Sequence, residues 1–378
     1  MYNGNFLEKI VEKESILPQL VSEINASGLP LLFFGTGAAA TALYNVASCY
    51  DLHISDVVVS SCDQPVEFMG FKVQNITDAL QKYDKCNIMI AFQNICKFQD
   101  THDGNSIEDY FRKTGKIGKI YYFDTNHSFF NQGEPGLNYS FVEKNQQTLD
   151  NLMKILADDL SRDTLTGFFN QRISGNIRYL DGRYIKDQYF PDEIKFEDNE
   201  VFIDCGAFDG DTIDIFIQKM KKEGKKIAKI FAFEPDEKNF GKLKDRGFEN
   251  TILFRKGVYN QKTTLCFTGA GNTRNAISEA GLFHVEVDTI DNTILAIPYI
   301  NNTGMLIKMD IEGSELAAIE GAKNTITAYK PKLAICVYHK NEDLITIPQK
   351  ILSFVPEYKL YLRAHRPLTD EVVLYAVK

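Results

Sequence analysis

Carboxylates and glycines gather directly after an apolar, strand-like segment near the middle of the chain. The turn that follows this segment contains Asp204, Gly206, Ala207, Asp209, Gly210, Asp211 and Thr212. Glycines let a backbone turn tightly and approach a ligand closely, and a small alanine keeps the path open. The acids would repel a pyrophosphate, so we expect this turn to bind a cationic or hydroxyl-rich ligand.

A second acidic turn, Glu234-Pro235-Asp236, follows the next strand-like segment. Glu234 comes 24 residues after Gly210. This is close to the spacing of about 20 residues at which an acid binds the ribose hydroxyls in nucleotide-binding βαβ units. The structural alternative is that the acids of both turns cap helices or occupy turns. The combination of the glycine turn with Glu234 favours a nucleoside site.

A third acidic group and a histidine follow two later apolar segments. Asp310 and Glu312 precede a helical segment and would point into a cleft, whereas Glu315 falls in the first helical turn, where the macrodipole favours an acid. His339 ends an apolar strand on the same side, which favours a catalytic or substrate-binding role over a structural one. Asp310 with Glu312 would supply only part of a ligand set for a hard cation, so we expect no metal.

These residues need a sheet that brings its strand ends together, because ligands bind beyond the carboxyl ends of parallel strands in doubly wound folds. Strand-like and helical segments alternate from Glu200 to the end, which is typical of βαβ units. The strands are expected at residues 200–206, 229–235, 250–259, 304–310, 332–339, 358–365 and 371–377. The short turn between the last two makes them antiparallel neighbours.

A similar alternation in the first third of the chain predicts a second parallel sheet, so we expect an α/β fold with two Rossmann-like domains. Strands are expected at residues 29–35, 54–61, 70–74, 86–92 and 116–123. Leucines spaced three and four residues apart near position 150 indicate helices between the two sheets. We therefore divide the chain into residues 1–147, a helical connector at 148–199, and residues 200–378.

The first of these units carries a GxGxxA pattern after a strand, from Gly35 to Ala40, and Asp63 follows the next strand. Free backbone amides in such a turn would suit the phosphates of a nucleotide-linked sugar. Close packing of the helix on the strand explains the small residues equally well. The stretch 269–281, rich in glycine and asparagine, is a candidate lid over an acceptor, or a loop without a role.

Composition excludes several classes of function. The net charge is −9 and is spread along the chain, and this negative balance argues against nucleic acid and against anionic membrane surfaces as partners. No apolar run reaches the roughly 18–20 residues of a membrane span, and charges interrupt the apolar start of the chain, so no secretory signal is expected. The seven cysteines are scattered without a CxxC pair, which predicts reduced thiols and a cytoplasmic location.

From about residue 160 to its end, the chain resembles the FkbM family of S-adenosylmethionine-dependent methyltransferases. The matching segments are VFIDCGAFDGDT (201–212), FAFEPD (231–236), VEVDTID (285–291), LIKMDIEGSELAAIEGA (306–322) and VYHKNEDL (337–344). The resemblance implies a class I methyltransferase fold, with a seven-stranded sheet whose last strand is antiparallel. It also implies S-adenosylmethionine as cofactor and O-methylation of a hydroxyl, often on a sugar or polyketide.

By this resemblance, Asp204, Gly206 and Gly210 shape the turn around the cofactor, and Glu234 holds its ribose. His339 and Asp310 are then candidate bases, with Glu312 positioning the acceptor and catalysis by positioning alone as an alternative. The first 150 residues resemble small Rossmann-like domains that precede sugar-modifying enzymes.

We therefore expect an O-methyltransferase acting on a sugar or glycan precursor, with a small-molecule, glycan or nucleotide-linked acceptor as partner. Two other classes stay open: an NAD-dependent sugar-modifying oxidoreductase and a non-catalytic nucleotide-binding module. The acidic first turn disfavours the oxidoreductase, because a dinucleotide pyrophosphate needs free amides rather than carboxylates. The presence of all the acids together with His339 disfavours the binding module.

Overall fold

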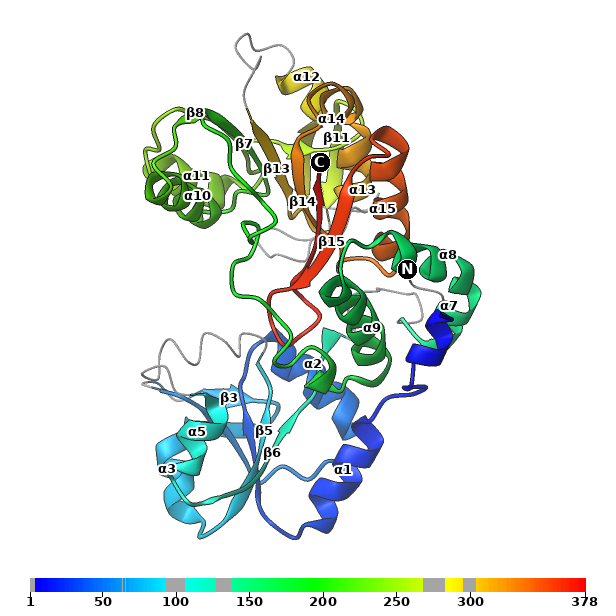
Figure 1. Cartoon of the computed structure of the whole chain (residues 1–378). Coiled ribbons are helices and arrows are strands. Elements are labelled where there is room, and N and C mark those ends of the chain that lie inside the picture. The colour runs from blue at the N-terminus through cyan, green and yellow to red at the C-terminus, as the bar shows by residue number, and fades with distance from the viewer. Residues whose placement is uncertain are drawn as a thin grey trace.

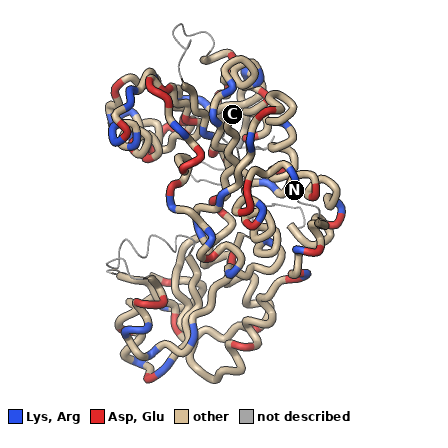
Figure 2. Tube along the Cα trace, in the orientation of Figure 1, with Lys and Arg blue, Asp and Glu red and all other residues tan. Residues whose placement is uncertain are grey.

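The computed structural model describes residues 4–62, 64, 66–92, 106–126, 137–267, 283–294 and 304–378. Two sheets with their helices form its lower, N-terminal part and its upper, C-terminal part, with helix α9 (Asp159–Ser174) between them (Figure 1). Acidic and basic positions are interspersed along the trace in both parts (Figure 2). Among the described residues, no helix combines the length and hydropathy needed to cross a membrane.

The N-terminal sheet has six strands in the order β3-β4-β2-β1-β5-β6. All neighbours are parallel except β3 and β4, so the expected parallel sheet is confirmed. Its strands are β1 (Leu31–Phe34), β2 (Asp56–Val59), β3 (Glu67–Phe68), β4 (Phe71–Asn75), β5 (Cys86–Ile90) and β6 (Ile117–Tyr122). Side chains alternate between two apolar clusters along β1, so the sheet is buried on both faces.

The helices of this part follow the strands as expected, with one addition. They are α1 (Leu17–Ala26), α2 (Ala38–Ser48), α3 (Ile76–Lys82) and α5 (Ile107–Arg112). Helix α1 was not expected, because it precedes the first expected strand and so lies outside the alternation of strands and helices. It begins with a proline in its first turn and buries Leu17, Val21 and Ile24 on one face.

Four helices lie between the two sheets in the chain: α7 (Tyr139–Lys144), α8 (Gln146–Ile155), α9 and η2 (Ile177–Tyr179). The short helix η1 (Phe6–Lys9), near the start of the chain, packs against α8. The segment between α8 and α9 covers the edge of the C-terminal sheet. The amide of Ala157 donates to the carbonyl of Leu360 at 2.8 Å, and the amide of Leu362 donates to Ser161 Oγ at 3.0 Å. Asp158 is the N-cap of α9. The two hydrogen bonds to β15 give part of this edge strand partners within the chain.

The C-terminal sheet has seven strands in the order β15-β16-β14-β13-β7-β8-β9. They are β7 (Glu200–Cys205), β8 (Ile227–Phe233), β9 (Thr251–Phe254), β13 (Met305–Met309), β14 (Lys332–Cys336), β15 (Lys359–Ala364) and β16 (Val372–Val377). Each expected strand is present. Only β16 runs against its neighbours, β14 and β15, which confirms the antiparallel last strand.

Two details of this part differ from the expectation. Residues 250–259 form two strands rather than one, because β10 (Gly257–Val258) leaves the large sheet. With β11 (Thr263–Phe267) and β12 (Phe283–Asp288) it makes a separate three-stranded sheet. The helix expected after β13 is broken into α13 (Glu315–Glu320) and α14 (Lys323–Tyr329) at Gly321, where a Cβ would lie 2.0 Å from the carbonyl oxygen of Tyr259.

The other helices of the C-terminal part are α10 (Asp211–Lys222), α11 (Glu237–Asp245), α12 (Ile290–Ile294) and α15 (Asp343–Phe354). Helices α10 and α11 begin directly after the two acidic turns that follow β7 and β8. Helix α15 was not expected and contains Pro348. The candidate lid at 269–281 lies outside the described residues, as does Asp63.

A buried polar network joins the two parts of the molecule at the carboxyl ends of their sheets. Asp124, which follows β6, accepts hydrogen bonds from Gln171 Nε2 at 2.8 Å and from the amide and hydroxyl of Thr369 at 2.9 and 2.8 Å. Arg172 donates to the carbonyl oxygens of Asn126 at 2.9 Å, Tyr338 at 2.8 Å and Thr369 at 3.2 Å. One guanidinium thus bonds the strand ends of both sheets.

Replacement of Asp124 by Asn should destabilise the protein, because the amide NH2 would face hydrogen-bond donors at a fully buried position. We expect Asp124→Asn to lower the free energy of unfolding by about 1–3 kcal/mol, measured by urea denaturation. Asp84→Asn, at an exposed position in the same part of the chain, is the matched control and should leave the midpoint unchanged. Equal midpoints for the two variants would show that the network contributes nothing to stability.

Candidate functional site

A cavity of about 1010 Å³ lies at the carboxyl ends of the C-terminal strands. The turns after β7, β8 and β13 form one wall, and the three-stranded sheet forms another. The predicted site residues that line it are Gly206, Asp211, Thr212, Glu234, Pro235, Asp236, Asp310 and Glu312. Asp204, Ala207, Asp209, Gly210 and His339 were also predicted and are not part of this lining.

The turn after β7 is fixed by backbone contacts. The amides of Gly206 and Ala207 both donate to the carbonyl of Phe233 at 3.0 Å, and the amide of Gly210 donates back to Ala207 at 2.8 Å. Gly206 has φ +85°, and a Cβ there would lie 2.0 Å from the carbonyl oxygen of Asp310. The glycine therefore allows the close approach of two neighbouring strand ends.

Asp204 lies behind this turn and is fully buried. Its Oδ1 is 3.0 Å from Nζ of Lys308, which also donates to the carbonyl of Gly206 at 2.7 Å. Burial raises the pKa of Asp204, against the lowering effect of the lysine charge. The pKa of Lys308 is raised because the negative charges of Asp204 and Asp310 outweigh the cost of burial. The pair supports the turn from below.

Glu234 reaches the cavity with both carboxylate oxygens already oriented. Its Oε2 accepts the amide of Phe208 at 2.9 Å, and its Oε1 accepts the amide of Asp236 at 2.8 Å. Burial raises the pKa of Glu234 to about 7, although both backbone hydrogen bonds lower it. The remaining lone pairs of the carboxylate are available for a hydroxyl-bearing ligand in the cavity.

The other acids of the two turns have local structural tasks. Asp236 is the N-cap of α11 and accepts the amide of Asn239 at 2.9 Å, while its side chain also borders the cavity. Asp211 is the first residue of α10, and the N-cap is Gly210, which has φ +90° and no side chain to cap the helix. Asp209 is half-buried beside them. Asp236 thus caps a helix and lines the cavity at the same time, so the capping role does not exclude a role in ligand binding.

The loop after β13 turns sharply to place its acids at the cavity. Glu312 has φ +56° and Gly313 has φ +91°, two successive residues in the left-handed region. A left-handed non-glycine residue is unfavourable by about 1–3 kcal/mol and such residues cluster at functional sites. Asp310 and Glu312 leave this loop partly exposed to the cavity, with 23% and 33% of their side-chain surfaces accessible.

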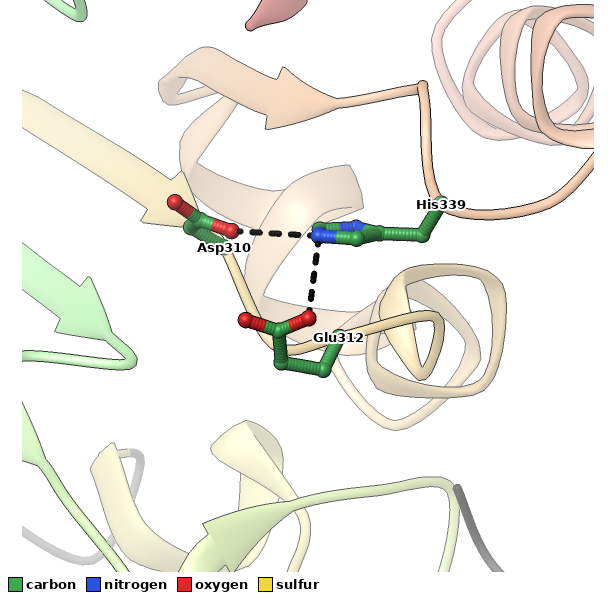
Figure 3. Close-up of side chains that lie close together, drawn as sticks. All are labelled: Asp310, Glu312 and His339. Atoms are coloured by element: carbon green, nitrogen blue, oxygen red, sulfur yellow. Dashed lines mark ion pairs between the residues drawn. The ribbon is translucent and has the colours of Figure 1, made fainter. Parts of the chain in front are cut away.

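His339, which follows β14, lies behind these two acids (Figure 3). Its Nε2 is 3.5 Å from Asp310 Oδ1 and 3.5 Å from Glu312 Oε2, and its Nδ1 is 3.0 Å from Glu315 Oε1. Burial alone would lower the pKa of His339, but the negative charges of Glu315, Asp310 and Glu312 raise it to about 10. The pKa of Asp310 is lowered because the charges of Lys308 and His339 outweigh burial.

Several cavity residues were not found from the sequence. Tyr189 donates its hydroxyl to Asp310 Oδ2 at 2.7 Å, and Tyr338 donates to Oδ1 at 3.4 Å. Glu371 borders the cavity, where it accepts a hydrogen bond from Gln188 and lies 3.2 Å from Arg366 Nη1. Burial raises the pKa of Glu371 to about 8. No motif marks Tyr189 or Glu371, since they lie in the connector and in the closing hairpin, whereas Tyr338 belongs to the VYHKNEDL segment and does not line the cavity.

The small-residue turn of the N-terminal part packs closely on its own sheet. A Cβ at Gly35 would lie 2.6 Å from the carbonyl oxygen of Ala91, so this glycine is required for the approach of β1 to β5. Gly37 is the N-cap of α2, and no atom lies within 4 Å of a Cβ built there. Packing accounts for the first glycine, and a ligand role for the turn stays a prediction.

Gly206 offers a direct test of the strand contact at the cavity. We expect Gly206→Ala to force β7 and β13 apart and to destabilise the protein. Gly224→Ala is the matched control, because Gly224 also has positive φ (+67°) but open space around a Cβ. The control should lower the free energy of unfolding by about 1–2 kcal/mol, and Gly206→Ala by about 1–3 kcal/mol more. Equal losses in the free energy of unfolding for the two variants would show that the turn accommodates the Cβ at position 206 without moving the strands apart.

Comparison with known proteins bears on this arrangement. The chain is similar to the crystal structure of the methyltransferase FkbM from Methylobacillus flagellatus KT, with a TM-score of 0.66 and 23% sequence identity over 98% of each chain. At this identity the likeness establishes the fold of the chain. No curated protein matches the sequence. The family model for the methyltransferase FkbM domain matches residues 204–365. The chain therefore carries an FkbM methyltransferase domain, and the resemblance expected from its motifs is confirmed.

Proposed function

We propose that this methyltransferase uses S-adenosylmethionine and transfers the methyl group to a hydroxyl of a sugar or glycan precursor. The observation that carries the proposal is that Glu234 and Asp310 line the same cavity. Glu234 is a carboxylate held in position by two backbone amides and could accept the hydroxyls of a ribose. Asp310 could accept the hydroxyl of an alcohol. Pockets for drug-sized ligands have volumes of about 300–1000 Å³, so this cavity has room for a cofactor together with an acceptor.

The residues present fit the cofactor. Glu234 would accept the ribose hydroxyls, and the turn from Gly206 to Thr212 would surround the amino-acid portion. The cofactor carries a sulfonium and an ammonium, so an acidic wall is favourable for it, whereas a dinucleotide pyrophosphate would meet Asp211 and Asp236. The bound cofactor supplies an electrophilic methyl group. This charge pattern supports a methyl donor over the NAD-dependent alternative.

The acceptor would lie at the end of the cavity formed by Asp310, Glu312 and Glu371. Carboxylates accept hydrogen bonds from sugar hydroxyls. Glu371, whose pKa is raised to about 8, can also donate one when it is protonated, which suits a sugar because each hydroxyl both donates and accepts. Asp310 borders the cavity and can contact the hydroxyl, whereas His339 reaches it through the acids. We propose that Asp310 and His339 handle the hydroxyl proton and that Glu312 positions the acceptor.

The N-terminal part would hold the rest of the acceptor. The carboxyl ends of its strands meet those of the methyltransferase sheet at Arg172, which bonds the carbonyls of both Asn126 and Tyr338. A nucleotide-linked or oligomeric sugar bound by the first sheet would therefore extend toward the cavity. This proximity supports a role in acceptor positioning over a role as a remote assembly module.

Cofactor affinity should depend on pH through Glu234. Below a pH of about 7 its carboxyl is protonated and neutral, and above it the carboxylate forms charge-assisted hydrogen bonds to the ribose. We expect the affinity for S-adenosylhomocysteine to rise with pH up to about 7 and then to level off. Glu234→Gln should remove this step and weaken binding at pH 8 by about 10–150-fold, measured by calorimetry.

The matched control for Glu234 is Glu237→Gln, which removes a largely exposed carboxylate at the rim of the same cavity. It should retain the affinity and the pH profile of the wild type. Titration with NAD should show no binding. If Glu234→Gln bound S-adenosylhomocysteine like the wild type, the nucleoside would have to lie elsewhere.

Asp310→Asn and His339→Ala should each lower turnover by about 10²–10⁴-fold without weakening S-adenosylhomocysteine binding. Transfer of a labelled methyl group to a panel of free sugars and nucleotide-linked sugars is the measurement. Asp192→Asn, at an exposed position in the connector, serves as the control. Full activity of both variants on an accepted sugar would leave positioning as the source of catalysis.

A further inference from the structure

We propose that Asp310, Glu312 and His339 bind a divalent metal ion at the acceptor end of the cavity. The use made of this ion rests on the proposed function, since it would hold the acceptor hydroxyl. Its binding rests only on the geometry of the three side chains. Each offers one ligand atom, and these atoms lie within 4.8 Å of one another.

The distances suit an ion better than direct contacts. Nε2 of His339 is 3.5 Å from one oxygen of each acid, which is too long for a good hydrogen bond. Two ligands bound at about 2.0–2.2 Å to the same ion, at angles between those of octahedral and tetrahedral geometry, lie roughly 2.8–3.6 Å apart. Asp310 and Glu312 are partly exposed, so their carboxylates can rotate to close the remaining separation.

The state of His339 is a second, independent indication. The residue is only 6% exposed, yet its Nε2 forms no hydrogen bond with any residue that the structure describes. Buried polar atoms of proteins nearly always have a partner. Here Nε2 points between the two acids (Figure 3), which is where a ligand would complete its bonding.

Glu315 lies where a carboxylate commonly contacts the second ring nitrogen of a metal-bound histidine. Its Oε1 is 3.0 Å from Nδ1, and the same oxygen accepts the amide of Ile311 at 2.9 Å, which fixes the carboxylate. Metal-binding histidines commonly place their second nitrogen against such a carboxylate, which orients the ring. Here Glu315 faces Nδ1 of His339, and Asp310 and Glu312 face Nε2.

The ligand set indicates which ion is preferred. Two carboxylate oxygens with one imidazole nitrogen favour Mn²⁺ or a similar first-row ion over Ca²⁺, which takes oxygen ligands alone. Because Asp310 and Glu312 border the cavity, the open coordination positions would face the acceptor. A hydroxyl bound there would lose its proton more readily. With the ion bound, the three side chains would act on the alcohol through it.

Titration of the purified full-length protein with MnCl2, followed by the loss of the free-ion signal in electron paramagnetic resonance, tests the site. We expect one strong site in the wild type. Asp310→Asn, Glu312→Gln and His339→Gln should each weaken it by at least about 10–100-fold. Glu315→Gln should weaken it less than these three. The control Glu237→Gln should bind Mn²⁺ as the wild type does, although it also removes a cavity carboxylate.

Calorimetry with S-adenosylhomocysteine on the same variants verifies that they are folded and separates the two proposals. Loss of Mn²⁺ binding in the three variants with retained S-adenosylhomocysteine binding supports the site. Retained S-adenosylhomocysteine binding without a strong Mn²⁺ site in the wild type overturns the metal and leaves the proposed function standing. A strong Mn²⁺ site insensitive to the three substitutions also overturns the proposal. Failure of S-adenosylhomocysteine to bind a protein that does bind Mn²⁺ contradicts the proposed function alone.

Discussion

The buried ammonium of Lys308 holds together the two turns on which the rest of the site depends. It contacts Asp204 on the neighbouring strand and the carbonyl of Gly206, both within 3.0 Å. A charge at this depth is strongly unfavourable without its partners, so β7 and β13 must keep their register and their turns must stay in contact. The absence of a side chain at Gly206 permits this contact. The same positive charge helps to keep Asp310 ionised at the wall of the cavity.

Left-handed backbone conformations occur at three residues that border the cavity. Tyr189, Phe208 and Glu312 all have φ between +48° and +65°. Two of these conformations are held by a contact that would be lost on relaxation: the amide of Tyr189 donates to the hydroxyl of Tyr375, and the amide of Phe208 donates to Glu234. Packing elsewhere compensates for this strain. The chain thus keeps unfavourable backbone geometry where it directs side chains into the cavity.

The sequence was sufficient for the strands of the methyltransferase sheet and for the acids that follow them, because apolar runs and the turns after them are local signals. It could not predict features that depend on distant contacts. Tyr189 binds an acid 121 residues away and belongs to no motif. The break between α13 and α14 at Gly321 arises from the close approach of the Tyr259 backbone. Residues 257–258, expected to continue β9, instead form β10 and pair with β12. The enclosure of His339 by three acids likewise requires two loops to meet in space.

The placement of Arg172 explains why the two sheets should act together. The two terminal nitrogens of its guanidinium donate to the carbonyls of Asn126 after β6, Tyr338 after β14 and Thr369 in the closing hairpin. Tyr338 directly precedes His339. Rotation of the N-terminal part would break these bonds and leave a charge buried among unpaired carbonyls, which is far more costly than the loss of a surface contact. The closing hairpin shares the network through Thr369 and carries Arg366 and Glu371 into the cavity. A displacement of the first sheet would therefore act on the end of the cavity formed by Asp310, Glu312 and Glu371 through residues adjacent in the chain, and the turn after β7 lies outside this network.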